Sequence, residues 1–129
     1  MKAVLDTSVL LLDAPETLDG ELAISAASLA ELHFGVLVAS NAKVRGARLL
    51  RLSAIKGRFD PLPIDDDVAA SYGLLAAAVV EAGRQPRARV FDLLIAATAH
   101  AHGASLCTAN PADVAGLEDL VPIIPVPTS

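Results

Sequence analysis

Four carboxylates stand beside short apolar segments of the chain, and together they could hold a divalent metal ion. They are Asp6, Glu31, Asp92 and Asp113. If all four meet at one edge of a sheet, like-charge repulsion would be severe unless a divalent cation neutralises it. Carboxylate oxygens suit Mg²⁺ or Mn²⁺, and an ion held in this way polarises a phosphoryl oxygen and activates water. The four acids therefore predict metal-assisted hydrolysis of phosphodiester bonds.

Each acid also has an explanation in helix capping alone. Asp6 would be the N-cap of the helix that follows it. Glu31 stands three residues after Ser28, which is the spacing of a capping box. Asp92 and Asp113 would lie in first turns, where the helix dipole favours an acid. Capping gives no reason for all four to converge on one side of a sheet, but for each acid taken alone it remains an open alternative.

The stretch from residue 92 to 114, DLLIAATAHAHGASLCTANPADV, is the one around which the other elements are arranged. It predicts an apolar, small-sided helix that begins near Asp92 and ends at Gly103. A buried strand over Ala104–Thr108 follows. A new helix is then expected to begin with Asn110 as its N-cap, which brings Asp113 into its first turn. A helix and strand in this order place two acids on the same edge of a sheet.

The remaining segments alternate in the same way, without hairpin turns. Strands are predicted over residues 2–6 and 22–25, an edge strand over 122–126, and helices over 28–40, 42–57 and 65–82. The three acids at 65–67 are interpreted as a cap with favourable dipole charges rather than metal ligands. The expected fold is α/β, a three-layer α/β/α sandwich with a central parallel sheet, built by residues 1–129 as a single domain.

The composition indicates in which cellular compartment the protein is expected. Hydrophobic residues make up 53% of the chain, the mean hydropathy is +0.53, and only 3% of residues are aromatic. A lone Cys107 in an apolar run excludes a disulfide within the chain and favours a reduced, cytoplasmic protein. Asp6 interrupts any signal peptide at the start, and residues 93–112 contain two histidines, a glycine and a proline, so no membrane segment is expected.

The net charge of −5 hides two basic groups. Six of the ten basic residues fall within residues 43–58, and Arg84, Arg87 and Arg89 come just before Asp92. Basic groups beside an acidic centre are compatible with binding the phosphates of a nucleic acid. For the first group, a solvated helix face is an equally good explanation.

Four motifs in order resemble those of the PIN domain family, and more narrowly the VapC-type toxins of bacterial type II toxin–antitoxin pairs. They are LDTS at 5–8, SxxE at 28–31, DLLIAATA at 92–99 and LCTANPAD at 106–113. The resemblance covers essentially the whole chain. It implies a PIN-like fold and a Mg²⁺- or Mn²⁺-dependent endoribonuclease. It also implies RNA as substrate, a cognate antitoxin that covers the site, and a homodimer.

The resemblance also implies roles for individual residues. Asp6, Glu31 and Asp92 match the three core metal-holding acids, and Asp113 matches a more variable fourth. The polar residues beside them (Thr7, Ser8, Thr108 and Asn110) would support the carboxylates or a phosphate, and Arg87 and Arg89 are phosphate contacts by position. The sequence departs from the family pattern in the shorter spacing between Asp6 and Glu31, and in having Val114 where a Phe is usual.

Two other kinds of function were weighed. A PIN domain that binds RNA or a protein partner without cutting is the alternative, although it would have no need for three metal-binding acids. A receiver-like signalling domain would require a lysine near the last strand, and none follows Lys56. His100 and His102 are two residues apart on a helix and point to different faces, so they do not predict a zinc site.

Overall fold

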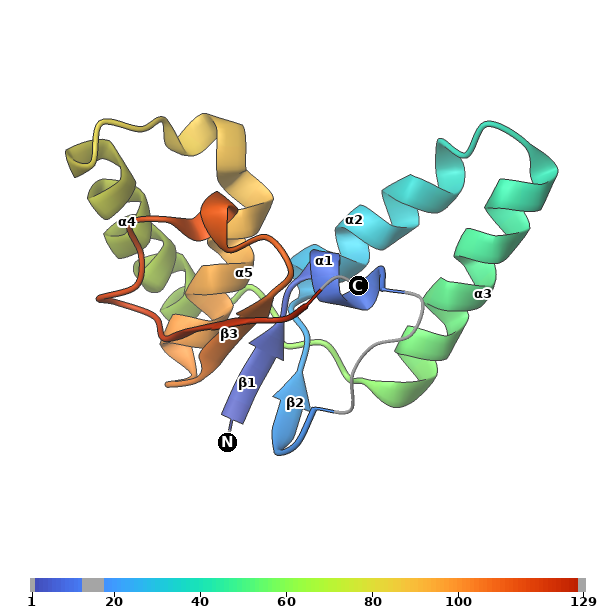
Figure 1. The fold of residues 1–129 in the computed structure, drawn as a ribbon, viewed down its shortest axis with the longest axis horizontal. Coiled ribbons are helices and arrows are strands. Elements are labelled where there is room, and N and C mark those ends of the chain that lie inside the picture. The colour runs from blue at the N-terminus through green and yellow to red at the C-terminus, as the bar shows by residue number, and fades with distance from the viewer. Residues whose placement is uncertain (1, 13–17, 128–129) are drawn as a thin grey trace.

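A computed structural model, which describes residues 2–12 and 18–127, shows a four-stranded parallel sheet between helices (Figure 1). The strands are β1 (Lys2–Leu5), β2 (Glu21–Ala23), β3 (Ser105–Thr108) and β4 (Ile123–Pro125), in the spatial order β2-β1-β3-β4. All three strand pairs are parallel. The predicted parallel sheet is therefore confirmed, with β4 and its proline at an edge as expected.

Five α-helices and two short 3-10 helices connect the described strands. They are α1 (Thr7–Leu10), α2 (Ala26–Leu37), α3 (Ala42–Arg58), α4 (Asp66–Glu81), η1 (Pro86–Arg89), α5 (Val90–Ala101) and η2 (Pro111–Val114). In Figure 1, α4 and α5 lie on one side of the sheet and the α2–α3 pair on the other. None of the helices in the described part of the chain is long and apolar enough to cross a membrane.

Two apolar clusters, one on each face of the sheet, form the core. Successive strand side chains point to opposite faces, so Val4 and Leu106 pack with α4 and α5. Their neighbours Leu5 and Cys107 pack with α1, α2 and α3 on the other face. The fold is the three-layer α/β/α sandwich that the sequence predicts.

The start of α2 differs from the sequence prediction. Its N-cap is Ser25, whose Oγ accepts a 3.0 Å hydrogen bond from the backbone N–H of Ala27, so the capping box from Ser28 to Glu31 is wrong. Leu62 bonds to the backbone on either side of Ser25 and holds it extended, which lets the helix begin earlier. Glu31 is the sixth residue of the helix, beyond the reach of the N-terminal N–H groups. Capping therefore does not explain it.

Glycines end α4 and α5 as the sequence predicts. Gly83 (φ +79°) and Gly103 (φ +62°) both take the left-handed conformation that glycine adopts at no steric cost. After α4, the N–H of Gly83 bonds to the carbonyl of Val80 and the N–H of Arg84 to that of Val79. These two bonds make a Schellman motif, which fixes the direction in which the chain leaves α4 towards η1.

Candidate functional site

The candidate site lies where β1 and β3 end side by side. Leu5 pairs with Cys107 in the sheet, and the N–H of Asp6 donates a 3.0 Å hydrogen bond to the carbonyl of Cys107. Parallel strands bring their C-terminal ends to one edge, where open α/β sheets bind ligands. Asp6 and Thr108 therefore lie side by side at the ends of their strands, although they are 102 positions apart in sequence.

One oxygen of Asp6 has a structural role. Its Oδ1 accepts a short hydrogen bond from Ser8 Oγ and a 3.3 Å bond from the N–H of Val9, so Asp6 is the N-cap of α1 as expected. Ser8 Oγ in turn accepts a 2.9 Å bond from the N–H of Ala109. No described residue hydrogen bonds to the second oxygen, Oδ2. Asp6 thus caps a helix and keeps one oxygen for a ligand.

Thr7 holds Glu31 in place. Thr7 Oγ1 lies 2.6 Å from Glu31 Oε1 and 3.1 Å from the oxygen of buried Ser28, close enough to bond to both. This contact joins the start of α1 to the second turn of α2, so Glu31 reaches the edge of the sheet from a helix rather than from a strand end.

Arg89 is paired with the other two acids. Its Nη1 donates a 2.8 Å hydrogen bond to Asp113 Oδ1 and lies 3.7 Å from Asp92 Oδ2. Both carboxylates are about one-third exposed. Arg89 was predicted to contact a phosphate. In the structure it neutralises acids, a pairing that the spacing of three residues before Asp92 could have indicated.

The pKa of Asp92 is raised above its ordinary value, and the other three acids contribute to that shift. Burial raises it most, followed by the negative charges of Asp113 and Glu31; Arg89 lowers it and Asp6 raises it again. The structure therefore brings together the four carboxylates that the sequence singled out. Asp92 carries the clearest sign of their crowding.

Thr108 and Asn110 stand next to these acids in different ways. Thr108 is fully buried; its Oγ1 accepts a 3.0 Å bond from the N–H of Asn110 and lies 3.4 Å from Ser8 Oγ. Asn110 is the N-cap residue of η2 and Pro111 follows it, as predicted, but the side chain of Asn110 makes no capping bond. The element that follows is a single 3-10 turn rather than the expected helix, and its backbone bond runs from the N–H of Asp113 to the carbonyl of Asn110.

A cavity of about 330 Å³ opens beside Glu31 and Asp92. Arg87 and Phe91 also line it, and both side chains are exposed. Arg87 has no hydrogen bond or ion pair with the described residues. The sequence prediction had placed no aromatic ring at the site. Phe91 could have been found from its position directly before Asp92.

The four acids have the right ligand atoms for a hard divalent cation, but their side chains are not yet arranged around one. Within residues 2–12 and 18–127, no three Asp, Glu, His or Cys side chains are already arranged to hold a metal ion. The four acids nevertheless offer oxygen ligands only, and burial, followed by the charges of the neighbouring acids, raises the pKa of Asp92. A divalent cation would relieve that repulsion. In the structure, the guanidinium of Arg89 balances part of the negative charge of Asp92 and Asp113.

Comparisons with known proteins agree with one another. The family model described as PIN domain matches residues 3–112. Ribonuclease VapC5 of Mycobacterium tuberculosis is 36% identical over 121 residues, covering 89% of this chain and 87% of that protein. The crystal structure of VapBC-5, a toxin–antitoxin family member from the same organism, has a TM-score of 0.84 at 33% identity, with 98% and 99% of the two chains covered. FitAcB from Neisseria gonorrhoeae has a TM-score of 0.75 at 26% identity, covering 95% and 96%.

Proposed function

The chain belongs to the PIN domain family, and on that premise we propose that it is a metal-dependent endoribonuclease, the toxin of a type II toxin–antitoxin pair. The observation that carries the proposal is the convergence of Asp6, Glu31 and Asp113 on Asp92, whose pKa they all raise. The relative named Ribonuclease VapC5 supports the activity. The related crystal structure described as a toxin–antitoxin system member supports the cellular role.

Asp6, Glu31, Asp92 and Asp113 would together be the ligands of Mg²⁺ or Mn²⁺. When bound, such an ion polarises a phosphoryl oxygen and lowers the pKa of water. The protein's own part is to place the ligands. Thr7 orients Glu31, and Ser8 orients Asp6 through the oxygen that faces the helix. Asp92 and Asp113 share Arg89, which balances their charge.

RNA reaches the site along exposed basic residues. Arg87 lines the cavity that contains Glu31 and Asp92, and its free guanidinium suits a phosphate next to the one that is cut. Phosphate contacts of this kind position the nucleic acid without reading its sequence. We propose that the enzyme acts on RNA in the cytoplasm.

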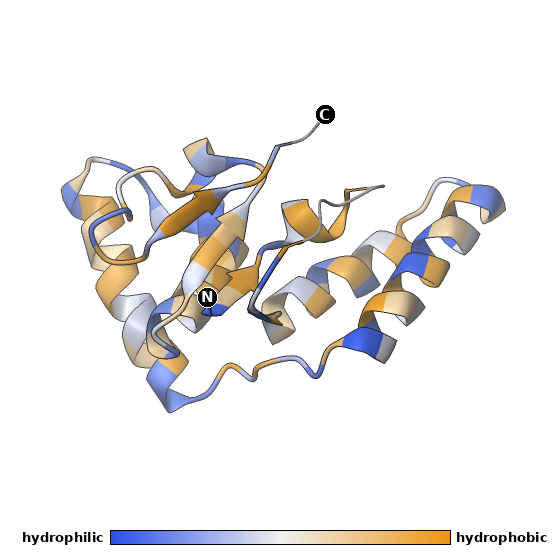
Figure 2. Ribbon diagram, turned by 60° about the horizontal axis from the view of Figure 1, so that its bottom comes forward, coloured by the Kyte–Doolittle hydropathy of each residue, from blue (hydrophilic) through white to orange (hydrophobic). Residues whose placement is uncertain are grey.

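A protein partner is supported by apolar side chains left in solvent. Phe34 and Leu37 on α2 and Leu50 on α3 are 66%, 77% and 75% exposed. Figure 2 shows hydrophobic residues interspersed with hydrophilic ones along these two helices. Exposed apolar groups in such number are typical of interaction surfaces. A cognate antitoxin, and a second copy of the chain in a homodimer, are the partners that this function requires.

Cleavage of total cellular RNA by the purified protein tests the proposal. The reaction is run with Mg²⁺, with Mn²⁺ and with EDTA, using wild type, Asp92→Asn and the control Asp66→Asn. Asp66 lies in the first turn of α4, so its loss changes the charge equally while leaving the site intact. Discrete bands that need metal and disappear only in Asp92→Asn are expected. Absence of cleavage with either metal would favour a binding domain without catalysis.

A further inference from the structure

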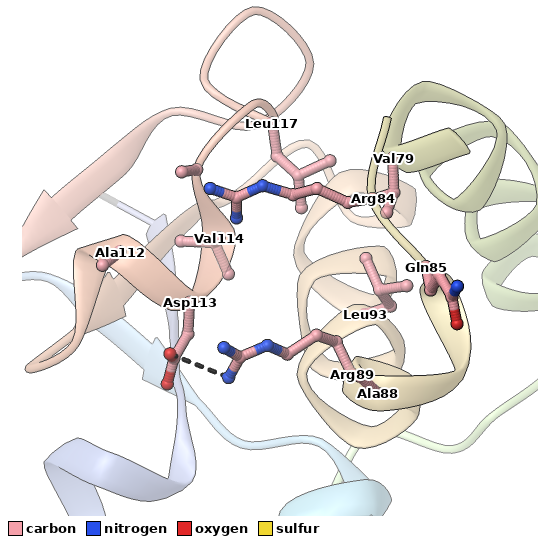
Figure 3. Close-up of a pocket in the computed structure, with 11 residues that line it drawn as sticks. Val79, Arg84, Gln85, Ala88, Arg89, Leu93, Ala112, Asp113, Val114 and Leu117 are labelled. Atoms are coloured by element: carbon pink, nitrogen blue, oxygen red, sulfur yellow. Dashed lines mark hydrogen bonds and ion pairs between the residues drawn. The ribbon is translucent and has the colours of Figure 1, made fainter. Parts of the chain in front are cut away.

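A larger cavity adjoins the acidic site and is not used by the proposed chemistry. It has a volume of about 480 Å³ and lies between the end of α4, the segment leading into α5, and η2 (Figure 3). Asp113 and Arg89 line both this cavity and the acidic site. Any group bound in the cavity would therefore lie next to the reacting phosphate.

The walls of the cavity combine apolar and cationic groups. Val79 and Leu93 come from α4 and α5, and Val114 and Leu117 from η2 and the turn after it. The side chains of Arg84 and Arg89 extend across the cavity from the same side towards η2 (Figure 3). The only acid in the lining, Asp113, is neutralised by Arg89. An occupant with an apolar face and a negative group would match these walls.

Arg84 supplies the unpaired positive charge. The Schellman motif after α4 fixes its backbone, with its N–H bonded at 3.0 Å to the carbonyl of Val79. Its guanidinium has no hydrogen bond or ion pair with any residue in the described ranges. Its backbone is therefore fixed beside the cavity, and its side chain offers a positive charge that no described residue neutralises.

We propose that this cavity binds one unpaired base of the RNA substrate, adjacent to the cleavage position, while Arg84 contacts the phosphate of that nucleotide. The inference rests on the proposed function and adds a subsite to it. A base presents flat apolar faces to the walls and carries a phosphate of the required charge, a combination typical of single-strand recognition. A base inside a duplex is stacked and paired, so it cannot enter. The cavity thus selects single-stranded segments.

The test moves one abasic ribonucleotide along a short fluorescent single-stranded RNA, centred on a cleavage site mapped with wild type. Affinity is measured by fluorescence anisotropy with Asp92→Asn protein, so that the probe stays intact. RNA that lacks the base at one position next to the cut should bind about tenfold more weakly than intact RNA. That loss is within the range for removing one base contact. In Ala115→Leu, which fills the cavity from a half-buried position, that dependence should disappear.

Further variants separate the two parts of the proposal. Arg84→Gln should reduce the salt dependence of binding by about one phosphate contact, whereas Lys43→Gln, on α3 away from the cavity, should not. The proposal is overturned if no position depends on its base, or if Phe91→Leu removes the dependence and Ala115→Leu does not. If wild type cuts no RNA, the proposed function fails, and the same scan on oligouridine tests the cavity by itself.

Discussion

Thr7 Oγ1 lies 2.6 Å from Glu31 Oε1, and this hydrogen bond is what connects the acid on α2 to the end of β1. The two residues are 24 positions apart, and Thr7 also contacts buried Ser28. Glu31 projects from the middle of a helix, and no other residue in the described ranges hydrogen bonds to its carboxylate. The orientation of this acid therefore depends on one hydroxyl group.

Thr7→Val removes that hydroxyl while keeping the shape of the side chain. We expect RNA cleavage to fall about tenfold or more, because a misplaced ligand group costs catalysis heavily. The free energy of unfolding should fall by about 1 kcal/mol, as for one lost hydrogen bond. Steady-state cleavage and urea denaturation measure the two effects. Thr7→Ser is the matched control and should behave like wild type; loss of activity in Thr7→Ser with full activity in Thr7→Val would mean that the methyl group matters instead.

Asp92→Asn should stabilise the metal-free protein at neutral pH. Burial and then the neighbouring acids raise the pKa of Asp92 above its ordinary 3.8. As the pH rises from 3.8 through the raised pKa, the folded chain still holds a proton that the unfolded chain has lost. Wild-type stability therefore decreases over that window. Asparagine does not ionise, so the free energy of unfolding of the variant does not decrease for this reason as the pH rises.

Urea denaturation in EDTA at pH 3.5 and pH 7 measures this difference. Relative to wild type, Asp92→Asn should gain stability between the two pH values. If the variant is instead less stable than wild type at pH 7, the favourable interaction of Asp92 with the dipole of α5 outweighs the repulsion from the other acids.

Arg89→Gln should make the protein more dependent on metal for stability. Arg89 lowers the pKa of Asp92 and pairs with Asp113, so its removal leaves two crowded carboxylates without a counter-charge. The melting temperature in EDTA should fall, and Mg²⁺ should raise it more than in wild type, because binding to the folded state stabilises it. Arg87→Gln, which breaks no ion pair, is the control. Identical responses of both variants to Mg²⁺ would contradict the role of Arg89.

Ser25→Ala should destabilise the fold by about 1–2 kcal/mol, the usual cost of losing an N-cap. It also removes the 3.1 Å contact between the oxygens of Ser25 and Thr98 in the core. Ser28→Ala should cost less, because Ser28 caps no helix and, among the described residues, its side chain hydrogen bonds only with Thr7. Chemical denaturation of both variants checks the order. The reverse order would restore the capping box that the structure replaces.

Much of this architecture could be predicted from local patterns. Apolar strands next to acids, together with glycine stops at Gly83 and Gly103, gave the order of elements and the parallel sheet. The four acids could be chosen because the ends of parallel strands and the helices after them share one edge. These features depend on residues close together in sequence, so a linear pattern reveals them.

The features that local patterns could not predict depend on residues that are distant in sequence. Ser25, rather than Ser28, is the N-cap of α2 because Leu62, far along the chain, holds the backbone of Ser25 extended. Arg89 turns to Asp113 because η2 places that acid opposite it, and no spacing in the sequence shows this. The cavity beside Arg84 is built by three separate segments. Tertiary contacts of this kind override local preference.

The hydrogen bonds that join Asp6 to Cys107, and Ser8 to Ala109, also determine when the site comes into existence during synthesis. A ribosome makes Asp6 and Glu31 early and Asp92 sixty-one residues after Glu31. At about 5–20 residues per second, the two halves are separated by several seconds. A nascent chain therefore carries only two of the four site acids until Asp92 is made, and Asp113 joins them only after β3 has been made and can pair with β1. The completed site is a property of the nearly finished polypeptide, so translation itself delays its appearance.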